Sequence, residues 1–208
     1  MTVNQDVLRL TSYVVSTDPK ISIVPGFLSD WECDQLITLS ESLGFQRSLV
    51  GRGKYAMTEE DKSSTLLNEY SENRTSSSVD LSRQNQRELM DPIEARLAGL
   101  TKLPVEHLED LMVVKYLPGQ FFGPHHDGIF RPATVFIYLN DLPESGGGET
   151  RFTNLGIRIK PRKGTAVYWR NMDEMGKEDS RLVHEALPPA DGAIKYGVNC
   201  FFNQHAMR

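Results

Sequence analysis

Hydrophobic positions recur at helical spacing in two segments of the first half of the chain. Apolar side chains fall three and four residues apart over residues 29–44. Ser29 and Glu32 form a capping-box pattern at the start of this segment, and Gly44 supplies a stop. A second helix is predicted through residues 88–100, whose apolar side chains form one stripe. Both helices are expected to cover one face of a sheet.

The pattern changes from residue 109 onward. Short runs rich in Val, Ile, Tyr and Phe are separated by Gly, Pro and Asn, which predicts strands joined by turns. Helices followed by strands favour an α+β fold, with the helices packed on one side of an antiparallel β-sandwich or barrel. The seven predicted strands lie within residues 109–117, 133–140, 147–152, 156–161, 164–169, 181–187 and 193–202.

The segment between the two predicted helices has no sustained periodicity. Residues 51–82 are rich in Ser, Thr, Asn, Glu and Lys, which predicts an irregular and mobile segment. Most such segments are solvated loops, but a long loop inside a compact domain is often a lid, so a substrate-covering loop is the second interpretation. The length fits a single domain over residues 1–208, in which residues 1–20 form an N-terminal extension.

Charge and cysteine content narrow the classes of partner. A formal net charge of -5, from 28 acidic and 23 basic residues, gives no electrostatic footprint for nucleic acid or an anionic membrane. Cys33 and Cys200 have no metal-ligand spacing, which argues against a disulfide framework. No signal peptide or long apolar run is visible, so a cytoplasmic or otherwise soluble protein is expected, with its oligomeric state left open.

A candidate metal site lies in the strand-rich half. In an extended segment, side chains two residues apart project to the same face, so His125 and Asp127 can converge on one ion while His126 points away. His184, in a later apolar strand, is the best third ligand. Two imidazoles and one carboxylate leave three positions open on an octahedral ion, as in non-haem Fe(II) oxygenases.

Several interpretations of these residues remain open at this point. The H-x-D pattern is common by chance, a histidine in an apolar strand is usually a core residue, and the same trio can hold zinc for hydrolysis. Lys195 lies in the next apolar strand, where a buried ammonium needs an anionic partner such as the far carboxylate of 2-oxoglutarate. Tyr116 and Thr150 can add hydroxyl hydrogen bonds to that carboxylate, whereas the alternative for Lys195 is a solvent-facing lysine.

Four segments resemble one known family. Residues 113–128, 134–152, 159–169 and 181–199 are similar to the prolyl 4-hydroxylases, within the Fe(II)- and 2-oxoglutarate-dependent oxygenases, and the resemblance covers most of residues 21–204. It implies a double-stranded β-helix, or jelly roll, with helices on the major sheet. The implied cofactors are Fe(II), 2-oxoglutarate, O2 and ascorbate, and the implied substrate is a proline-containing peptide or protein.

The resemblance also assigns roles to the metal and cosubstrate residues. A lysine at the position of Lys195 resembles the collagen-type enzymes and their plant, algal and bacterial relatives, whereas other prolyl hydroxylases use arginine there. The implied iron ligands and catalytic residues are His125, Asp127 and His184, and the implied 2-oxoglutarate residues are Lys195, Tyr116 and Thr150.

Three further residues carry expectations from the resemblance. Residues 73–82 are similar to the loop of the family that approaches the peptide, so Arg74 is a candidate substrate contact. Trp169 is expected near the substrate and Asn199 beside the cofactor, with core packing and strand-end hydrogen bonding as their respective alternatives. The chain departs from the family pattern at Glu185, where a small residue is common, and substrate preference stays open for that reason.

The competing functions differ in substrate or in class. One keeps the oxygenase chemistry but acts on a free amino acid or another small molecule. Another is a non-catalytic jelly-roll binding module, which the complete ligand set argues against. A zinc hydrolase ranks last because no H-E-x-x-H motif is present. Asp127 argues against a halogenase, whose carboxylate ligand is replaced by a small residue.

Overall fold

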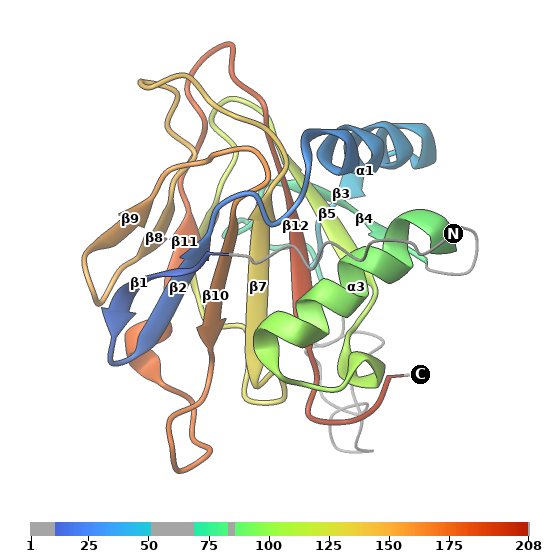
Figure 1. Ribbon diagram of the computed structural model, residues 1–208. Helices are drawn as coiled ribbons and strands as arrows, with labels where there is room; N and C mark the ends of the chain where they lie inside the picture. Colours follow the sequence, from blue (N-terminus) through green and yellow to red (C-terminus); the bar gives the residue numbers. More distant parts are fainter. Residues whose placement is uncertain (1–10, 51–68, 83–85, 208) are drawn as a thin grey trace, which may run out of the picture.

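The computed structural model describes residues 11–50, 69–82 and 86–207. Their strands form two antiparallel sheets that pack face to face, and both long helices lie on the outer side of the larger sheet (Figure 1). This arrangement confirms the predicted α+β class with helices packed on the major sheet. No helix in these ranges is long and apolar enough to cross a membrane.

The larger sheet has the strand order β1-β2-β10-β7-β12-β5-β4-β3. Every residue of β7 is buried, because one face of this central strand meets the helices and the other meets the smaller sheet. The strands of the larger sheet are β1 (Tyr13–Thr17), β2 (Lys20–Val24), β10 (Ala166–Arg170), β7 (Ala133–Tyr138), β12 (Lys195–Phe202), β5 (Leu111–Tyr116), β4 (Ser77–Leu81) and β3 (Gln46–Arg47).

The smaller sheet has the order β6-β11-β8-β9. Aromatic side chains fill the space between the sheets: the ring of Phe152 meets Trp169 edge-on at 5.3 Å between centroids. Two short 3-10 helices, η3 (Val105–His107) and η4 (Ser180–Leu182), precede β5 and β11. The strands of this sheet are β6 (Phe122–His125), β11 (His184–Ala186), β8 (Thr150–Phe152) and β9 (Ile157–Ile159).

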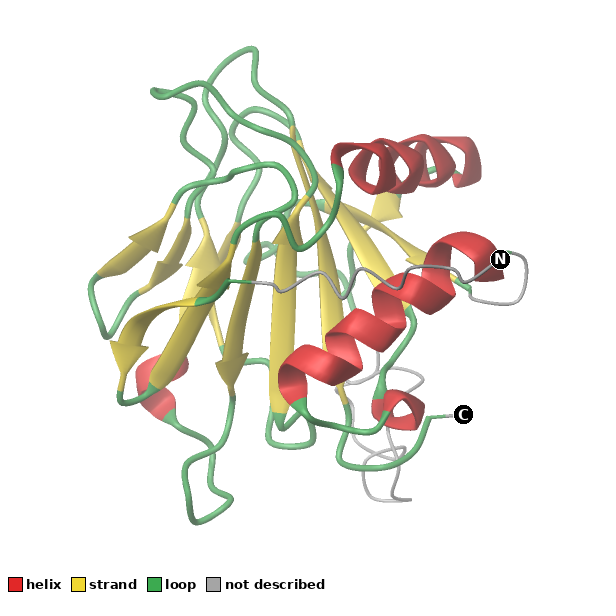
Figure 2. Ribbon diagram, in the orientation of Figure 1, coloured by secondary structure: helices red, strands yellow, loops and turns green. Residues whose placement is uncertain are grey.

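Both predicted helices are confirmed, as α1 (Asp30–Leu43) and α3 (Arg87–Thr101). The capping box of Ser29 and Glu32 starts α1, where it satisfies backbone N–H groups that the first turn leaves unpaired. Figure 2 shows the two helices on the same side of the major sheet. They contribute Cys33, Leu36, Met90, Ile93 and Leu97 to the core, against sheet residues that include Val113, Val135, Ile137 and Val198.

The prediction of irregular structure over residues 51–82 is wrong at its end. Residues 77–81 form β4, which pairs with β5 along its whole length. A strand forms in this serine-rich segment because the ladder satisfies its backbone groups while Val79 and Leu81 pack on the core. The first part of the predicted mobile loop, residues 51–68, lies outside the described residues.

The expected N-terminal extension over residues 1–20 is also wrong in part. β1 pairs with β2, and β2 pairs with β10, so this region continues the major sheet. Ile21 and Val24 are fully buried, and they anchor β2 in the core. The apolar segment of β2 is too short for its periodicity to predict a strand. Residues 1–10 lie outside the described part of the chain.

Gly164→Ala is expected to destabilise the fold more than Gly156→Ala. Both glycines have positive φ, 72° and 67°, so alanine is strained at either position by roughly 1–2 kcal/mol. A Cβ at Gly164 would also lie 2.3 Å from the carbonyl oxygen of Leu28, whereas nothing lies within 4 Å at Gly156. Urea unfolding should therefore show the larger loss of unfolding free energy for Gly164→Ala, and equal losses would contradict this close approach.

Candidate metal centre and cosubstrate pocket

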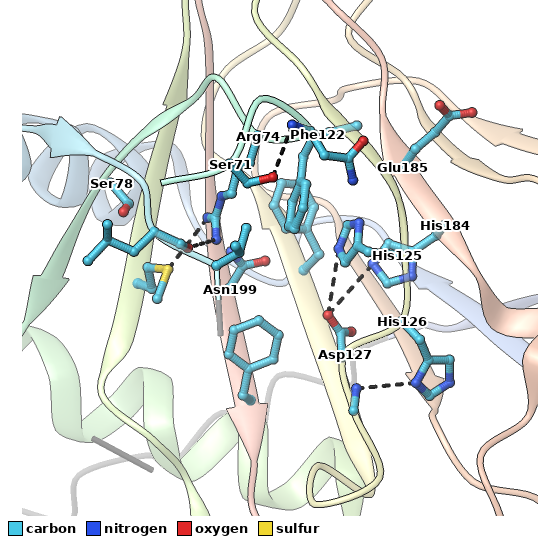
Figure 3. A pocket seen from close by; sticks show the side chains of 18 of the residues that line it. Ser71, Arg74, Ser78, Phe122, His125, His126, Asp127, His184, Glu185 and Asn199 are labelled. Carbon is cyan, nitrogen blue, oxygen red and sulfur yellow. Dashed lines mark hydrogen bonds and ion pairs between the residues drawn. The ribbon is translucent and has the colours of Figure 1, made fainter. Parts of the chain in front are cut away.

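A cavity of about 620 Å³ opens between the two sheets. The inner face of the major sheet supplies one wall, through side chains that include Tyr116, Phe136 and Asn199. The smaller sheet supplies the opposite wall, through His125 and His184. All the candidate site residues predicted from the sequence, except Lys195, thus line this one cavity, and Figure 3 shows many of its side chains.

His125, Asp127 and His184 meet at one end of this cavity. His125 ends β6 and is the direct register partner of His184 at the start of β11, so the two imidazoles project from neighbouring strands to the same side. Asp127 follows two residues after His125, and its Oδ1 lies 3.8 Å from Nε2 of each histidine. The three candidate ligand atoms lie within 4.8 Å of one another.

His126 points away from this trio, as expected for the intervening residue of an extended H-x-D segment (Figure 3). Its Nδ1 accepts a hydrogen bond of 3.2 Å from the backbone N–H of Gly128 and lies 3.4 Å from the carboxylate of Glu178. His126 is therefore held by the neighbouring loops at the cavity wall, apart from the trio.

Backbone carbonyls orient both imidazole rings. The Nδ1 atoms of His125 and His184 lie 2.8 and 3.0 Å from the carbonyl oxygens of Gly123 and Leu182. Because a carbonyl only accepts, each Nδ1 carries a hydrogen, and Nε2 is the ring nitrogen that can offer a lone pair toward the trio. Burial, with His184 nearby, lowers the pKa of His125 to about 3, so the imidazole is neutral, as a metal ligand requires.

Asp127 completes the trio as a buried carboxylate, 8% exposed. Burial opposes its ionisation, yet His184, His125 and a 2.7 Å hydrogen bond from the Thr134 hydroxyl together hold its pKa below the usual value. Two imidazole nitrogens and one anionic oxygen converge from one side, a donor set that fits a divalent ion with open positions on the other side. Geometry alone does not distinguish iron from zinc here.

Lys195 is fully buried beside the cavity, so it is not the solvent-facing lysine of the alternative interpretation. Its Nζ forms no hydrogen bond with any residue that the structure describes. The rings of Tyr116, Phe136 and Tyr138 surround it, with centroids 5.2, 5.2 and 5.4 Å away. Burial lowers the pKa of Lys195 to about 7, while Glu149 opposes the shift. A buried ammonium of this kind needs an anionic partner, and the carboxylate of a ligand can be that partner.

Tyr116 and Thr150, the two predicted hydroxyl residues, both line the cavity. Tyr116 is the register partner of Lys195 across β5 and β12. The Thr150 hydroxyl is held at 2.7 Å by the hydroxyl of Tyr138, which also lies 3.0 Å from the carbonyl oxygen of Ile159. Sequence reasoning missed Tyr138, although a tyrosine in the fully buried run of β7 must find partners for its hydroxyl.

Arg74 is buried at the cavity wall, 7% exposed. It donates to the carbonyl oxygen of Leu49 at 3.0 Å, and its guanidinium carbon lies 4.6 Å from the centroid of the Phe122 ring. That ring in turn stacks on His125 at 3.5 Å and 12° (Figure 3). Arg74, the predicted substrate contact, thus lines the cavity, and it supports a candidate metal ligand through Phe122.

Trp169 and Asn199 differ in how far they face the cavity. Trp169 is only 1% exposed, and its ring lies 4.9 Å from that of His184 and 5.3 Å from that of Phe152. This position favours a supporting role over the expected contact with substrate. Asn199 is half-buried on β12, and its side chain lines the cavity on the wall opposite His125 and His184 (Figure 3).

Comparisons with known proteins agree with this architecture. The sequence pattern of the 2OG-Fe(II) oxygenase superfamily matches residues 111–203. A probable prolyl 4-hydroxylase 6 of Arabidopsis thaliana is 33% identical, over 90% of this chain and 69% of the relative. Prolyl 4-hydroxylase 1 of the same plant is 31% identical, over 93% of this chain and 72% of the relative. The chain thus spans about two thirds of the length of these plant relatives.

Solved structures extend the comparison to three dimensions. A viral collagen prolyl hydroxylase from Paramecium Bursaria Chlorella virus-1, in complex with 2-oxoglutarate, superimposes with a TM-score of 0.67 at 27% identity, covering 87% of this chain and 94% of the other. A prolyl-4-hydroxylase from Pseudomonas putida has the same fold, with a TM-score of 0.63 at 20% identity, covering 88% and 92%. The expected jelly roll is confirmed, and the chain belongs to the prolyl 4-hydroxylase family of Fe(II)- and 2-oxoglutarate-dependent oxygenases.

Proposed function

We propose that this protein is a prolyl 4-hydroxylase that hydroxylates peptidyl proline with O2 and 2-oxoglutarate and releases succinate and CO2. The observation that carries the proposal is Lys195, a buried ammonium without a hydrogen-bond partner among the described residues. Its Nζ lies against the rings of Tyr116 and Phe136, which line the same cavity as the His-Asp-His trio. A dicarboxylate fits this pair of features, because one end can meet a metal while the other neutralises the lysine.

His125, Asp127 and His184 are the proposed iron ligands. Their support is the shared orientation of the two Nε2 atoms and Asp127 Oδ1, together with the neutral state of His125. Bound by them, Fe(II) would supply the redox centre that couples oxidative decarboxylation of 2-oxoglutarate to hydroxylation of the substrate. The protein's own contribution is to fix the tautomers of both rings and to keep the carboxylate ionised.

Lys195, Tyr116 and Thr150 are the proposed partners of the far carboxylate of 2-oxoglutarate. The ammonium supplies the charge, and the two hydroxyls supply hydrogen bonds whose directions the neighbouring strands fix. The rings of Phe136 and Tyr138 exclude water from this end of the cavity, which strengthens the ion pair once it forms.

The remaining cavity is the proposed site for proline and its flanking peptide. Arg74 lines this part with a guanidinium that can donate to peptide carbonyl oxygens, and Phe122 and Phe201 supply apolar surface for a proline ring. Asn199 lies between the two parts and is proposed to hydrogen-bond the cosubstrate.

Hydroxylation of proline-rich peptides is the direct test. The wild-type protein with Fe(II), ascorbate and 2-oxoglutarate is expected to release succinate and to add the mass of one oxygen atom to the peptide, measured by mass spectrometry. Asp127→Ala should abolish both products, because it removes the anionic ligand, whereas Asp191→Ala, at an exposed turn, should retain them. Turnover of free proline but not of peptides would contradict the proposed substrate.

The affinity for 2-oxoglutarate is expected to fall with rising pH. Because the pKa of Lys195 is lowered to about 7, the charged form that pairs with a carboxylate is present below that pH and is lost above it. Calorimetric titration should show the Kd rising about tenfold per pH unit above this pKa, with one proton taken up per ligand bound. Lys195→Arg, whose guanidinium stays charged, should remove this pH dependence even if its affinity is lower. A pH-independent wild-type Kd would contradict the pairing.

Lys195→Met is expected to stabilise the ligand-free protein. Burial of the ammonium shifts the pKa from 10.5 to about 7, which corresponds to a cost on the order of 3–5 kcal/mol at pH 6 and below. That cost diminishes as pH rises above about 7, because the folded state no longer has to hold the charge. Thermal unfolding at pH 6 should show a higher midpoint for Lys195→Met, and no further rise on adding 2-oxoglutarate. A lower midpoint than the wild type would count against an uncompensated buried charge.

A further inference from the structure

A continuous line of buried hydrogen bonds runs behind Asp127. The indole N–H of Trp169 donates to Asn171 Oδ1 at 2.8 Å, and Asn171 Nδ2 donates to Thr134 Oγ1 at 2.9 Å. The Thr134 hydroxyl then donates to Asp127 Oδ2 at 2.7 Å. Asn171 is 0% exposed, and Thr134 and Trp169 are each 1% exposed, so no water competes for these groups.

The chemistry of the groups allows only one direction for this line. An indole N–H only donates, so the atom of Asn171 that faces Trp169 must be the carbonyl oxygen. The amide nitrogen then faces the backbone carbonyl of Arg131, at 2.8 Å, and the hydroxyl oxygen of Thr134. Because that oxygen accepts from Asn171, the single hydrogen of Thr134 is left for Asp127.

The strands hold these residues rigidly. Trp169 and Thr134 are direct register partners across β10 and β7, in the centre of the major sheet. The backbone N–H of Asn171 donates to the carbonyl oxygen of Pro132 at 3.1 Å, and its own carbonyl accepts from the N–H of Asp179 at 3.0 Å. Each member of the line is therefore fixed by backbone as well as by side-chain contacts.

The same line reaches a second candidate ligand. The ring of Trp169 lies 4.9 Å from that of His184, at 67° between the planes. His184 is otherwise fixed by the Leu182 carbonyl on its Nδ1. One tryptophan thus contacts His184 through its ring and is linked to Asp127, through Asn171 and Thr134, by its N–H.

We propose that Trp169, Asn171 and Thr134 are positioning residues that fix Asp127 as a ligand through one oxygen only. Thr134 holds Oδ2 away from the trio, and Oδ1 is left 3.8 Å from both imidazole Nε2 atoms. A carboxylate free to turn could offer both oxygens and take a position that cosubstrate or oxygen needs. This inference rests on the proposed metal site and adds the residues that set its geometry.

Thr134→Val tests the line, because it keeps the shape of the side chain and removes the hydroxyl. The readouts are the affinity for Co(II) measured by calorimetry without 2-oxoglutarate, and the visible absorption of bound Co(II), which reports its coordination. Thr134→Val is expected to weaken Co(II) binding by about 10- to 100-fold and to change the absorption spectrum. Thr134→Ser should restore both, since the hydroxyl returns.

Two further variants keep the test decisive. Thr101→Val removes another buried threonine hydroxyl, one that bonds the Leu97 carbonyl in α3, and should leave Co(II) binding unchanged. Trp169→Phe keeps a ring beside His184 but removes the N–H that sets the Asn171 amide, and should weaken Co(II) binding severalfold. If Thr134→Val does not fold, this variant carries the test.

The outcomes distinguish the proposed metal site from the positioning role of Thr134, Asn171 and Trp169. Absence of Co(II) binding by the wild type, or equal binding by Asp127→Ala, overturns the proposed metal site itself. Normal binding by the wild type with an unchanged Kd and spectrum in Thr134→Val overturns the positioning role and leaves the metal site standing. The inference is supported if Thr134→Val weakens Co(II) binding, Thr134→Ser restores it and Thr101→Val leaves it unchanged.

Discussion

The pairing of β6 with β11 is the contact on which the site depends. It sets His125 directly opposite His184, so two imidazoles from residues far apart in sequence share one face of the smaller sheet. Asp127 follows β6, and the major sheet supplies the supporting groups: Thr134 and Trp169 contact the trio from behind. Lys195, on the same sheet, is buried against the cavity-lining rings of Tyr116 and Phe136. A shift of one residue in this register would turn the imidazoles to opposite faces and leave the rest of the cavity without a centre.

The cavity combines groups that each reduce the stability of a folded protein. A buried ammonium and a buried carboxylate lie between sheets whose other inward residues are largely aromatic or aliphatic. The carboxylate is compensated within the chain by Thr134 and the two histidines, whereas the ammonium has no such compensation among the described residues. The uncompensated group is the one whose proposed partner is consumed in each reaction, so the fold keeps that position available to ligand.

Sequence patterns predicted the strongly periodic and strongly capped elements. The capping box gave α1, and the Val- and Ile-rich runs gave the strands from β5 to β12 except β6. β4 and β6 were missed because their serine, glycine and proline residues resemble loop composition, and their pairing comes from distant strands. The candidate ligands were predicted from spacing, but Asn171 and Tyr138 were not, because their importance lies in hydrogen-bond partners that only the folded chain brings near.

The position of β12 has a consequence for how the protein is made. This strand follows every other strand in the described chain, yet it lies between β7 and β5 at the centre of the major sheet. During synthesis β5 and β7 leave the ribosome with the gap between them unfilled, and both expose edges until residues 195–202 insert. The strand that closes this gap also carries Lys195 and Asn199, so the proposed cosubstrate pocket is incomplete until the centre of the sheet is filled.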